Sequence, residues 1–243
     1  MESKPFLHCR QLSKRYTVEQ QTFKAVAQVE LQVQAGEFIT ILGHSGSGKT
    51  TLLSLIGGLT SADQGEVVLS GVNPWQGNDR EISAIRNRQI GFIFQFASLI
   101  STLTALENVL LPLSFACGSS EGLAGNQGLG GGQGRQKAIQ LLEQVGLGDK
   151  LRCYPGQLSG GQQRRVAIAR AFITEPRLIL ADEPTGDLDE ATEAEILAFF
   201  RTKNQEGTTF VVVTHNRELY RSQPGARVFQ MKNGALAEEL EPR

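Results

Sequence analysis

The sequence predicts an α/β fold with three parts: a parallel sheet flanked by helices, an antiparallel β segment before it and a helical segment inserted into it. Residues 38–58 have the pattern of a buried strand, a glycine-rich turn and a helix. The short apolar runs Leu178–Ala181 and Phe210–Val213 flank a second helical pattern. Strands that alternate with helices indicate a parallel sheet. Strand signals disappear between about residues 96 and 159, which indicates the inserted helical segment.

The first elements in chain order are a half-exposed strand, a buried strand and a helix. Apolar and polar residues alternate over 29–34, which is typical of an antiparallel strand with one solvated face. Phe38–Leu42 is continuously apolar and rich in β-branched residues, which predicts a strand covered on both faces. Apolar residues then recur at helical spacing over 52–56, and Gly57 marks the expected end of that helix.

The inserted segment combines a region of low complexity with a helix. Gly118–Gly134 is rich in Gly, Ser, Asn and Gln, and glycine loses much backbone entropy on ordering, so a flexible surface loop is expected. A second phosphate-binding loop is disfavoured because no strand precedes it and no lysine follows in the required place. The next helix is expected to end at Gly146. Its apolar stripe consists of Ala138, Leu141, Leu142 and Val145.

Two patterns occupy the end of the chain. Asn233-Gly234 predicts a hairpin between Arg227–Met231 and Ala235–Leu240, because both turn residues tolerate positive φ. Before it, a helix is expected between the two apolar strands. Its predicted shared face consists of Ala194, Leu197 and Ala198.

Composition excludes several classes of protein. The 243 residues carry 24 Lys and Arg against 25 Asp and Glu, with a formal net charge of -1, so no nucleic-acid partner is expected. The longest apolar runs, such as Leu52–Leu59, are far shorter than the roughly 20 residues that cross a bilayer. The N-terminal residues lack the apolar run of a secretory signal, which predicts a cytosolic location. Cys9, Cys117 and Cys153 are scattered, so reduced structural cysteines are expected rather than a zinc site.

The glycine-rich turn matches the phosphate-binding pattern G-x-x-x-x-G-K-[ST] in the strand-to-helix context that the pattern requires. Its glycines let backbone N–H groups curl around phosphate oxygens, and the helix N-terminus adds a favourable dipole. Lys49 can reach the β- and γ-phosphates, and Thr50 can place its hydroxyl on Mg²⁺. Nucleotide binding is predicted, and the pattern alone is compatible with a kinase, a GTPase or an ATPase. The residues assigned to this site are Gly43, His44, Ser45, Gly46, Ser47, Gly48, Lys49, Thr50 and Thr51.

An acidic pair ends the predicted strand at 178–181. In a protein with a phosphate-binding loop, the first acid, Asp182, lies near the metal on the Thr50 side, and the second, Glu183, can polarise the attacking water. An isolated Asp-Glu before a proline is also compatible with a simple turn. The phosphate-binding loop upstream is what favours the catalytic interpretation.

A third pattern, Leu158–Gln162, precedes a predicted helix. A serine and two glycines at a helix start leave free N–H groups at the positive end of the dipole, which indicates a second anion site. An ordinary capped helix is equally compatible with these five residues. Because Lys49 and Ser159 belong to different parts of the chain, both would grip one ATP most simply in a homodimer whose copies face each other head to tail. The residues assigned to this second site are Ser159, Gly160, Gly161 and Gln162.

These patterns resemble those of the ABC-transporter ATPases across nearly the whole chain. The residues that carry the resemblance are the loop at 43–50, Gln95 after Phe92-Ile93-Phe94, Leu158–Gln162, Asp182-Glu183, Gly186-Asp187-Leu188-Asp189 and Thr214-His215. The resemblance implies a P-loop NTPase with a RecA-like parallel-sheet core, an N-terminal antiparallel β-subdomain and an inserted helical subdomain. It divides the single domain, 1–243, into a nucleotide-binding core at 1–95 and 160–243 and a helical subdomain at 96–159.

The same resemblance implies roles for further residues. Gln95 and His215 take part in catalysis, Gln95 also contacting the metal and coupling the nucleotide site to a membrane partner, and His215 touching the γ-phosphate. Asp189 lies in a loop between subunits and contacts the nucleotide site. Tyr16 stands where family members place an aromatic that stacks on adenine, which needs only a π face. Asn216 departs from the family pattern, since an aspartate commonly follows the histidine.

A narrower resemblance is to the LolD/MacB branch, which includes lipoprotein-release, macrolide-export and FtsE-like members. It is carried by Ile90–Gln95, Leu103–Val109 and Leu180–Gly186. It implies an ATP- and Mg²⁺-dependent ATPase subunit, peripheral on the cytoplasmic face of the inner membrane, that drives a separately encoded transmembrane permease by dimer closure and reopening. A periplasmic or envelope partner would join this assembly. Export, or extraction of lipoproteins or amphiphiles, is the expected work.

Two other functions remain as alternatives. An FtsE-like ATPase would regulate an envelope or cell-division complex without moving a solute, and the sequence does not separate it from an exporter. A non-transport ABC protein that remodels DNA or the ribosome is disfavoured, because the chain shows no long coiled coil, zinc module or second ATPase unit.

Overall fold

The computed structural model describes residues 4–116, 131–186, 188–216, 218–221 and 223–240. In chain order, its strands are β1 (Leu7–Val18), β2 (Gln21–Val33), β3 (Phe38–Leu42), β4 (Gln64–Leu69), β5 (Ile90–Ile93), β6 (Leu178–Asp182), β7 (Thr209–Thr214), β8 (Arg227–Lys232) and β9 (Ala235–Leu240). Its α-helices are α1 (Lys49–Ile56), α2 (Asp79–Gln89), α3 (Ala105–Ala116), α4 (Gly131–Gln144), α5 (Gly160–Phe172), α6 (Glu190–Gln205) and α7 (Glu218–Arg221). Two short 3₁₀ helices are η1 (Pro74–Gln76) and η2 (Pro155–Gln157).

A mixed sheet with the strand order β5-β6-β7-β3-β8-β9 forms the centre of the molecule. Neighbours from β5 to β8 are parallel, and the β8–β9 pair at the edge is antiparallel. The predicted α/β class and parallel core are therefore confirmed. The predicted hairpin is also confirmed, since Asn233 and Gly234 join β8 to β9 with φ of 51° and 80°. The strands of a parallel sheet end at the same edge, so the loops after β3, β5, β6 and β7 lie close together.

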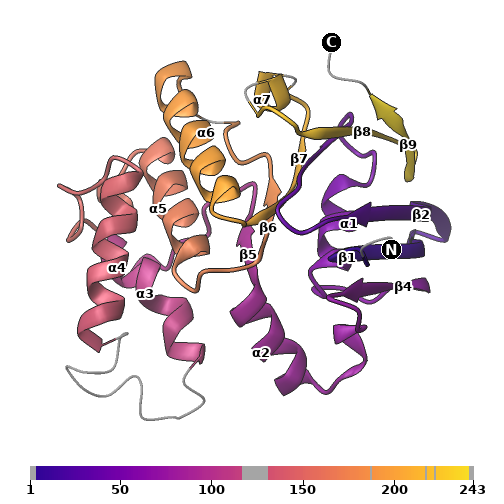
Figure 1. Cartoon of the computed structure of the whole chain (residues 1–243), viewed down its shortest axis with the longest axis horizontal. Helices are drawn as coiled ribbons and strands as arrows, with labels where there is room; N and C mark the ends of the chain where they lie inside the picture. The colour runs from indigo at the N-terminus through magenta and orange to yellow at the C-terminus, as the bar shows by residue number, and fades with distance from the viewer. Residues whose placement is uncertain (1–3, 117–130, 187, 217, 222, 241–243) are drawn as a thin grey trace.

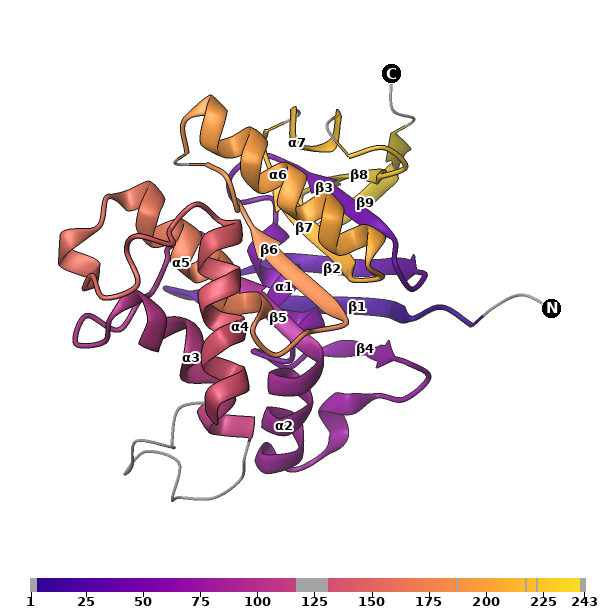
Figure 2. The ribbon, with the colours of Figure 1, turned by 60° about the vertical axis from the view of Figure 1, so that its left-hand side comes forward.

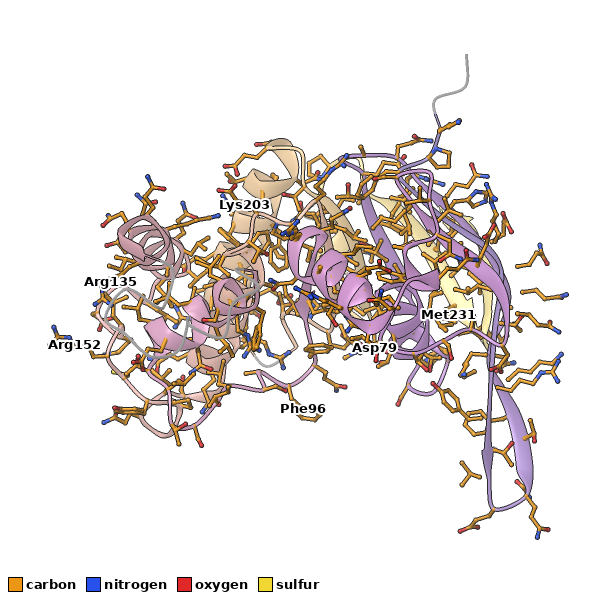
Figure 3. The ribbon with its side chains drawn as sticks, turned by 90° about the horizontal axis from the view of Figure 1, so that it is seen from below. Asp79, Phe96, Arg135, Arg152, Lys203 and Met231 are labelled. Carbon is orange, nitrogen blue, oxygen red and sulfur yellow. The ribbon has the colours of Figure 1, made fainter. Side chains whose placement is uncertain are left out.

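The smaller sheet is antiparallel and has the order β2-β1-β4. The alternation over 29–34 correctly predicted the inner half of β2, whose apolar residues are buried while the polar ones between them are exposed. β1 was not predicted. Its register shifts between Cys9 and Leu12, and Gln11 there has φ of 49°, so its buried residues do not keep a period of two. The far end of the β1–β2 hairpin extends beyond the rest of the fold (Figure 3).

The three parts lie side by side, with the central sheet between the small sheet and the helices α3, α4 and α5 (Figure 1). α1 follows β3 with Leu52, Leu55 and Ile56 buried, as predicted, and it ends at Gly57. α6 crosses in front of the central strands in the turned view (Figure 2).

The predicted face of α6 is correct at Leu197 and wrong at its two alanines. Ala194 and Ala198 are exposed, and the buried stripe is made by Ile196, Leu197, Phe199 and Phe200. The larger side chains remove more apolar surface from water, so they decide which face of the helix turns inward.

The predicted stripe is buried: Ala138, Leu141 and Leu142 lie in α4, Val145 lies directly after its end, and Gly146 follows with φ of 70°. The low-complexity segment needs a correction, because Gly131–Gly134 form the first turn of α4; the rest of it, 118–130, lies outside the described residues. A Cβ at Gly134 would lie 2.9 Å from Leu113 Cδ1, so α3 and α4 approach closely there. Glycine at position 134 thus permits the close helix packing, at a helix-propensity cost of about 1 kcal/mol relative to alanine.

α5 packs against α3, α4 and β5. The expected division places α5 with the nucleotide-binding core, from residue 160, and the structure gives this helix contacts to both parts. The larger apolar cluster is continuous through this region, from Leu106 and Leu142 to Ile168 and Phe210.

Cys9 is buried and Cys153 is half-buried, and both are free thiols. Burial raises the pKa of the Cys9 thiol to about 12, which keeps it protonated and unreactive. Cys117 lies outside the described residues.

Phe210 on β7 provides a test of the core. Its side chain is fully buried and its ring stacks on Phe38 with centroids 4.9 Å apart, so Phe210→Ala should lower the free energy of unfolding by about 3–5 kcal/mol. Phe96→Ala is a matched control, because Phe96 is 75% exposed, and it should change stability by no more than about 0.5 kcal/mol. Urea denaturation of both variants measures the difference, and equal losses would contradict the assignment of the core.

Candidate functional site

A cavity of about 900 Å³ opens at the edge where the parallel strands end. The loops after β3, β5, β6 and β7 contribute to its wall, together with the β1–β2 hairpin. The predicted site residues that line it are Tyr16, His44 to Thr51, Gln95, Asp182, Glu183 and His215. The fold therefore brings together groups that lie up to 199 positions apart in the sequence, from Tyr16 to His215.

The phosphate-binding pattern forms a tight loop, and one position in it, Gly48, has room only for glycine. Gly48, at the start of α1, has φ of 105°, and a Cβ on it would lie 2.0 Å from the carbonyl oxygen of Ala25. Lys49 is buried, and its Nζ donates to the carbonyl oxygens of Gly43 (2.7 Å) and His44 (3.1 Å). Gly43, a predicted site residue, does not line the cavity. Its carbonyl oxygen accepts a hydrogen bond from Lys49 instead.

Thr50 and Asp182 meet across the cavity floor. The Thr50 hydroxyl donates to Asp182 Oδ2 at 2.6 Å, which links the start of α1 to the end of β6. Burial raises the pKa of the Asp182 carboxyl, and the neighbouring Glu183 acts in the same direction, while the Thr50 hydrogen bond and the charges of Lys49 and Arg164 oppose this rise. A divalent cation beside these oxygens would lower the pKa of the Asp182 carboxyl, as the charges of Lys49 and Arg164 do, and so favour its ionised form.

Glu183 and His215 are paired between the ends of β6 and β7. Glu183 Oε1 lies 2.8 Å from Nδ1 of the His215 ring and also accepts from the backbone N–H of His215. Glu183 Oε2 accepts from the Thr214 hydroxyl at 2.7 Å. The backbone at Glu183 has φ of 46°, a conformation that costs a non-glycine residue on the order of 1–3 kcal/mol and that is concentrated at functional sites.

Two aromatic rings form the outer wall of the cavity. Tyr16 and Phe23 face each other across the β1–β2 hairpin, with ring centroids 6.0 Å apart, and both are more than a third exposed. Gln95 also lines the cavity, from the exposed loop after β5. The cavity lining therefore combines the π faces of two aromatic rings with a lysine and two carboxylates.

The remaining predicted site residues lie outside this cavity. Ser159 and Gly160 are exposed at the N-terminus of α5, where Ser159 Oγ accepts from the Gln162 N–H and Gln162 Oε1 accepts from the Ser159 N–H. Gly161 is half-buried in the same turn. Asp189 caps α6, and hydrogen bonds from the backbone and hydroxyl of Thr192 lower its pKa. Asp187 lies outside the described residues.

Several residues of the site were not predicted. Phe23, Lys24, Ala25 and Asn233 line the cavity through the two hairpins, and no sequence signal separates them from ordinary hairpin residues. Arg164 is 3% exposed, and its Nη1 donates to the carbonyl oxygens of Phe94 (3.0 Å) and Glu183 (3.3 Å). A signal for it existed: an arginine in phase with the buried Ile168 and Phe172 of its helix needs buried acceptors.

A groove of about 480 Å³ lies between α2 and α3, beside β5. Its apolar wall includes Leu59, Phe94 and Phe115, which are 46%, 42% and 70% exposed. Phe96, which follows Gln95 in the chain, is 75% exposed and points away from the fold (Figure 3). Large exposed apolar side chains gathered in one place mark an interaction surface. None of the described helices combines the length and the hydropathy that would let it traverse a bilayer.

Comparison with known proteins identifies the family. The family model described as "ABC transporter" matches residues 26–186. This chain belongs to the ABC transporter family. The cassette is 41% identical to the lipoprotein-releasing system ATP-binding protein LolD of Alcanivorax borkumensis, over 96% of this chain and 97% of that one. It is an ABC ATPase that is similar to the LolD/MacB branch.

A second relative is longer than this cassette. The macrolide export ATP-binding/permease protein MacB of Rhodopirellula baltica is 43% identical over 96% of this chain, and the cassette spans 32% of the length of that relative. Among solved structures, the dimeric ATP-binding cassette MJ0796 in a post-hydrolysis state bound to ADP and Pi has a TM-score of 0.87 and 38% identity, covering 98% of this chain and 99% of that one. The α/β architecture is thus that of an ABC cassette.

The glycine-rich loop gives a test of the cavity. Gly46→Ala introduces backbone strain of about 1–2 kcal/mol at φ of 77° but meets no atom within 4 Å, whereas Gly48→Ala also collides with the Ala25 carbonyl. Gly48→Ala should therefore weaken ATP binding by about ten-fold or more, and Gly46→Ala by clearly less. Titration with a fluorescent ATP analogue measures both affinities. Equal losses would show that close packing at Gly48 does not shape the loop.

Proposed function

We propose that this cassette binds and hydrolyses ATP–Mg²⁺ as a homodimer and drives a transmembrane permease of the LolD/MacB type. The observation that carries the proposal is the split arrangement of the predicted site. Lys49, Thr50, Asp182 and Glu183 share one cavity, while Ser159 is exposed outside it, at the start of α5.

The cavity offers groups that can bind both the adenine base and the phosphates of ATP. Tyr16 or Phe23 supplies the π face for adenine, and the loop at His44–Thr51 holds the phosphates. In the structure, Lys49 Nζ is bonded to two backbone carbonyl oxygens. When ATP binds, oxygens of the β- and γ-phosphates replace at least one of these neutral carbonyl acceptors. A lysine binds charged oxygens more strongly than neutral ones.

The donor set fits Mg²⁺, which prefers oxygen ligands and commonly binds one or two carboxylates together with substrate phosphates. The Thr50 hydroxyl and the Asp182 carboxylate are already 2.6 Å apart, and Gln95 contributes an amide oxygen to the same cavity. When bound, the cation would neutralise charge that develops on the β- and γ-phosphates. Asp182 orients Thr50 toward that position.

Glu183 is the group that we assign to the attacking water. Its carboxylate lies at the cavity wall with side-chain exposure of 13% and holds donors from Thr214 and His215. A water that replaces the His215 contact would be polarised by the carboxylate, and the released imidazole could then reach the γ-phosphate. The left-handed backbone at Glu183, with φ of 46°, accompanies its contact with His215, and such strain is concentrated at functional sites.

A second copy would complete the site. Ser159 and Gly160 are exposed at the N-terminus of α5, and neither they nor Gly161 line the cavity of their own chain. In a head-to-tail dimer, that end would contact the phosphates of the facing copy, as its free N–H groups and dipole favour. The dimeric state of the similar cassette MJ0796 supports this arrangement. Asp189 would lie between the copies.

The groove between α2 and α3 is the docking site that we assign to the permease. It adjoins Phe94, the residue before Gln95, so a partner seated there would sense the nucleotide cavity. MacB is named as an ATP-binding/permease protein and this cassette spans 32% of its length, which supports a permease of that kind as the partner. We place the assembly on the cytoplasmic face of the membrane. Its work would be export or extraction of a lipoprotein or other amphiphile, together with an envelope partner.

Glu183→Gln tests the catalytic assignment. The variant should retain ATP affinity and form dimers with ATP, because the phosphate loop is unchanged, while its turnover falls by about 10²–10⁴-fold. Phosphate release and size-exclusion chromatography with ATP measure the two properties. Turnover equal to that of the wild type would contradict the role of Glu183. A Glu183→Gln protein that stays monomeric with ATP, together with unchanged turnover of Ser159→Arg, would contradict the dimer.

Phe115→Asp tests the groove. A carboxylate on this apolar wall should abolish copurification with a coexpressed permease of the LolD/MacB type. It should leave basal ATP hydrolysis unchanged, because Phe115 is 70% exposed and does not line the nucleotide cavity. Val72→Asp is the control, since Val72 is 64% exposed but does not line the groove. Copurification of Phe115→Asp at the wild-type level would contradict the docking assignment.

A further inference from the structure

We propose that Glu193 is a positioning residue that ties the first turn of α6 to the loop that carries His215. The proposal rests on the catalytic roles assigned above to Glu183 and His215. Neither the phosphate-binding pattern nor the acidic pair includes Glu193, which stands on α6, four residues after Asp189.

One oxygen of Glu193 joins two loops of the central sheet. Glu193 Oε1 accepts from the Thr185 hydroxyl at 2.7 Å and from the Asn216 side-chain amide at 3.0 Å. Thr185 follows β6 and is 4% exposed, and Asn216 follows β7. Hydrogen bonds to a carboxylate are shorter and stronger than those between neutral groups, so this oxygen fixes the distance between the two loops.

The contact continues to the catalytic glutamate. The backbone N–H of Asn216 donates to the Thr214 hydroxyl oxygen at 3.0 Å, and that hydroxyl donates to Glu183 Oε2 at 2.7 Å. Asn216 therefore links Glu193, through its side-chain amide, to Thr214 and Glu183, through its backbone N–H. Networks of this kind hold their members in one arrangement more firmly than separate pairs do.

The other end of this network lies where α6 begins. Asp189 caps the helix by accepting from the backbone N–H and the hydroxyl of Thr192, so the first turn that carries Glu193 is rigidly attached to the Asp189 segment. We assigned that segment to the region between the two copies. Glu193 thus gives a movement of this segment a direct route to the Glu183 and His215 pair.

The contact also explains the asparagine at position 216. A carboxylate only accepts hydrogen bonds, so Glu193 needs a donor opposite it, and the Asn216 amide supplies one. An aspartate at position 216 would place two carboxylates about 3 Å apart, where like charges repel strongly. Asn216 and Glu193 therefore form a matched pair in this chain.

A double-mutant cycle tests the proposal. Asn216→Asp should lower kcat for ATP on the order of ten-fold or more, because the repulsion displaces the loop that carries His215. KM for ATP should stay within about two-fold, since the Lys49 loop is untouched. Adding Glu193→Gln to Asn216→Asp should restore most of kcat, because the glutamine can accept from Thr185 and donate to the new aspartate. Glu193→Gln alone should change kcat by less than about three-fold, since its amide oxygen still accepts from either donor.

The matched control is Glu195→Gln, which removes an exposed carboxylate from the same helix and should neither alter kcat nor rescue Asn216→Asp. Thermal unfolding of every variant separates a displaced loop from a damaged fold. Wild-type turnover in Asn216→Asp, or rescue by Glu195→Gln as good as that by Glu193→Gln, would overturn the positioning role alone. A wild-type protein without turnover would overturn the proposed catalytic roles and this inference with them.

Discussion

The structure depends on the parallel register of four central strands. Because β3, β5, β6 and β7 run in the same direction, each ends at one edge of the sheet, and each carries a functional loop there. The register pairs Asp182 with Val213, so the next residues along the two strands, Glu183 and Thr214, come within hydrogen-bond distance. A shift of one residue would separate them and turn every side chain of the strand to the opposite face.

The groups at this edge are already hydrogen-bonded in the structure. Lys49 donates hydrogen bonds to two carbonyl oxygens, and Thr50 donates one to Asp182. Glu183 is hydrogen-bonded to His215 and Thr214. Buried charges without partners are costly, so these contacts stabilise the cassette before any nucleotide binds. In the mechanism proposed above, binding and hydrolysis proceed by exchanging these partners rather than by creating new charge. The Glu193 contact would make the exchange of partners at Glu183 and His215 depend on the position of α6.

Local patterns predicted much of the fold correctly. The strand at Phe38–Leu42, the helix after it and the Asn233-Gly234 hairpin all follow from burial, helical spacing or tolerance of positive φ. Local patterns failed where packing decides. α6 buries its phenylalanines rather than the predicted alanines, and Gly131–Gly134 are helical because α3 and α4 approach each other closely at Gly134. β1 escaped prediction because its bulges break the alternation.

The sequence by itself determined which chemical groups the cassette has: a glycine loop with its lysine, an acidic pair after a buried strand, and a serine-glycine helix start. Their residue types and local spacing carry that information, because each depends on neighbours in the chain. Only the tertiary structure decided which groups meet. It placed Thr50 against Asp182, brought Phe23 and Asn233 to the same cavity, buried Arg164 between two loops and paired Glu193 with Asn216. Contacts between distant segments depend on strand order and register, which no local pattern specifies.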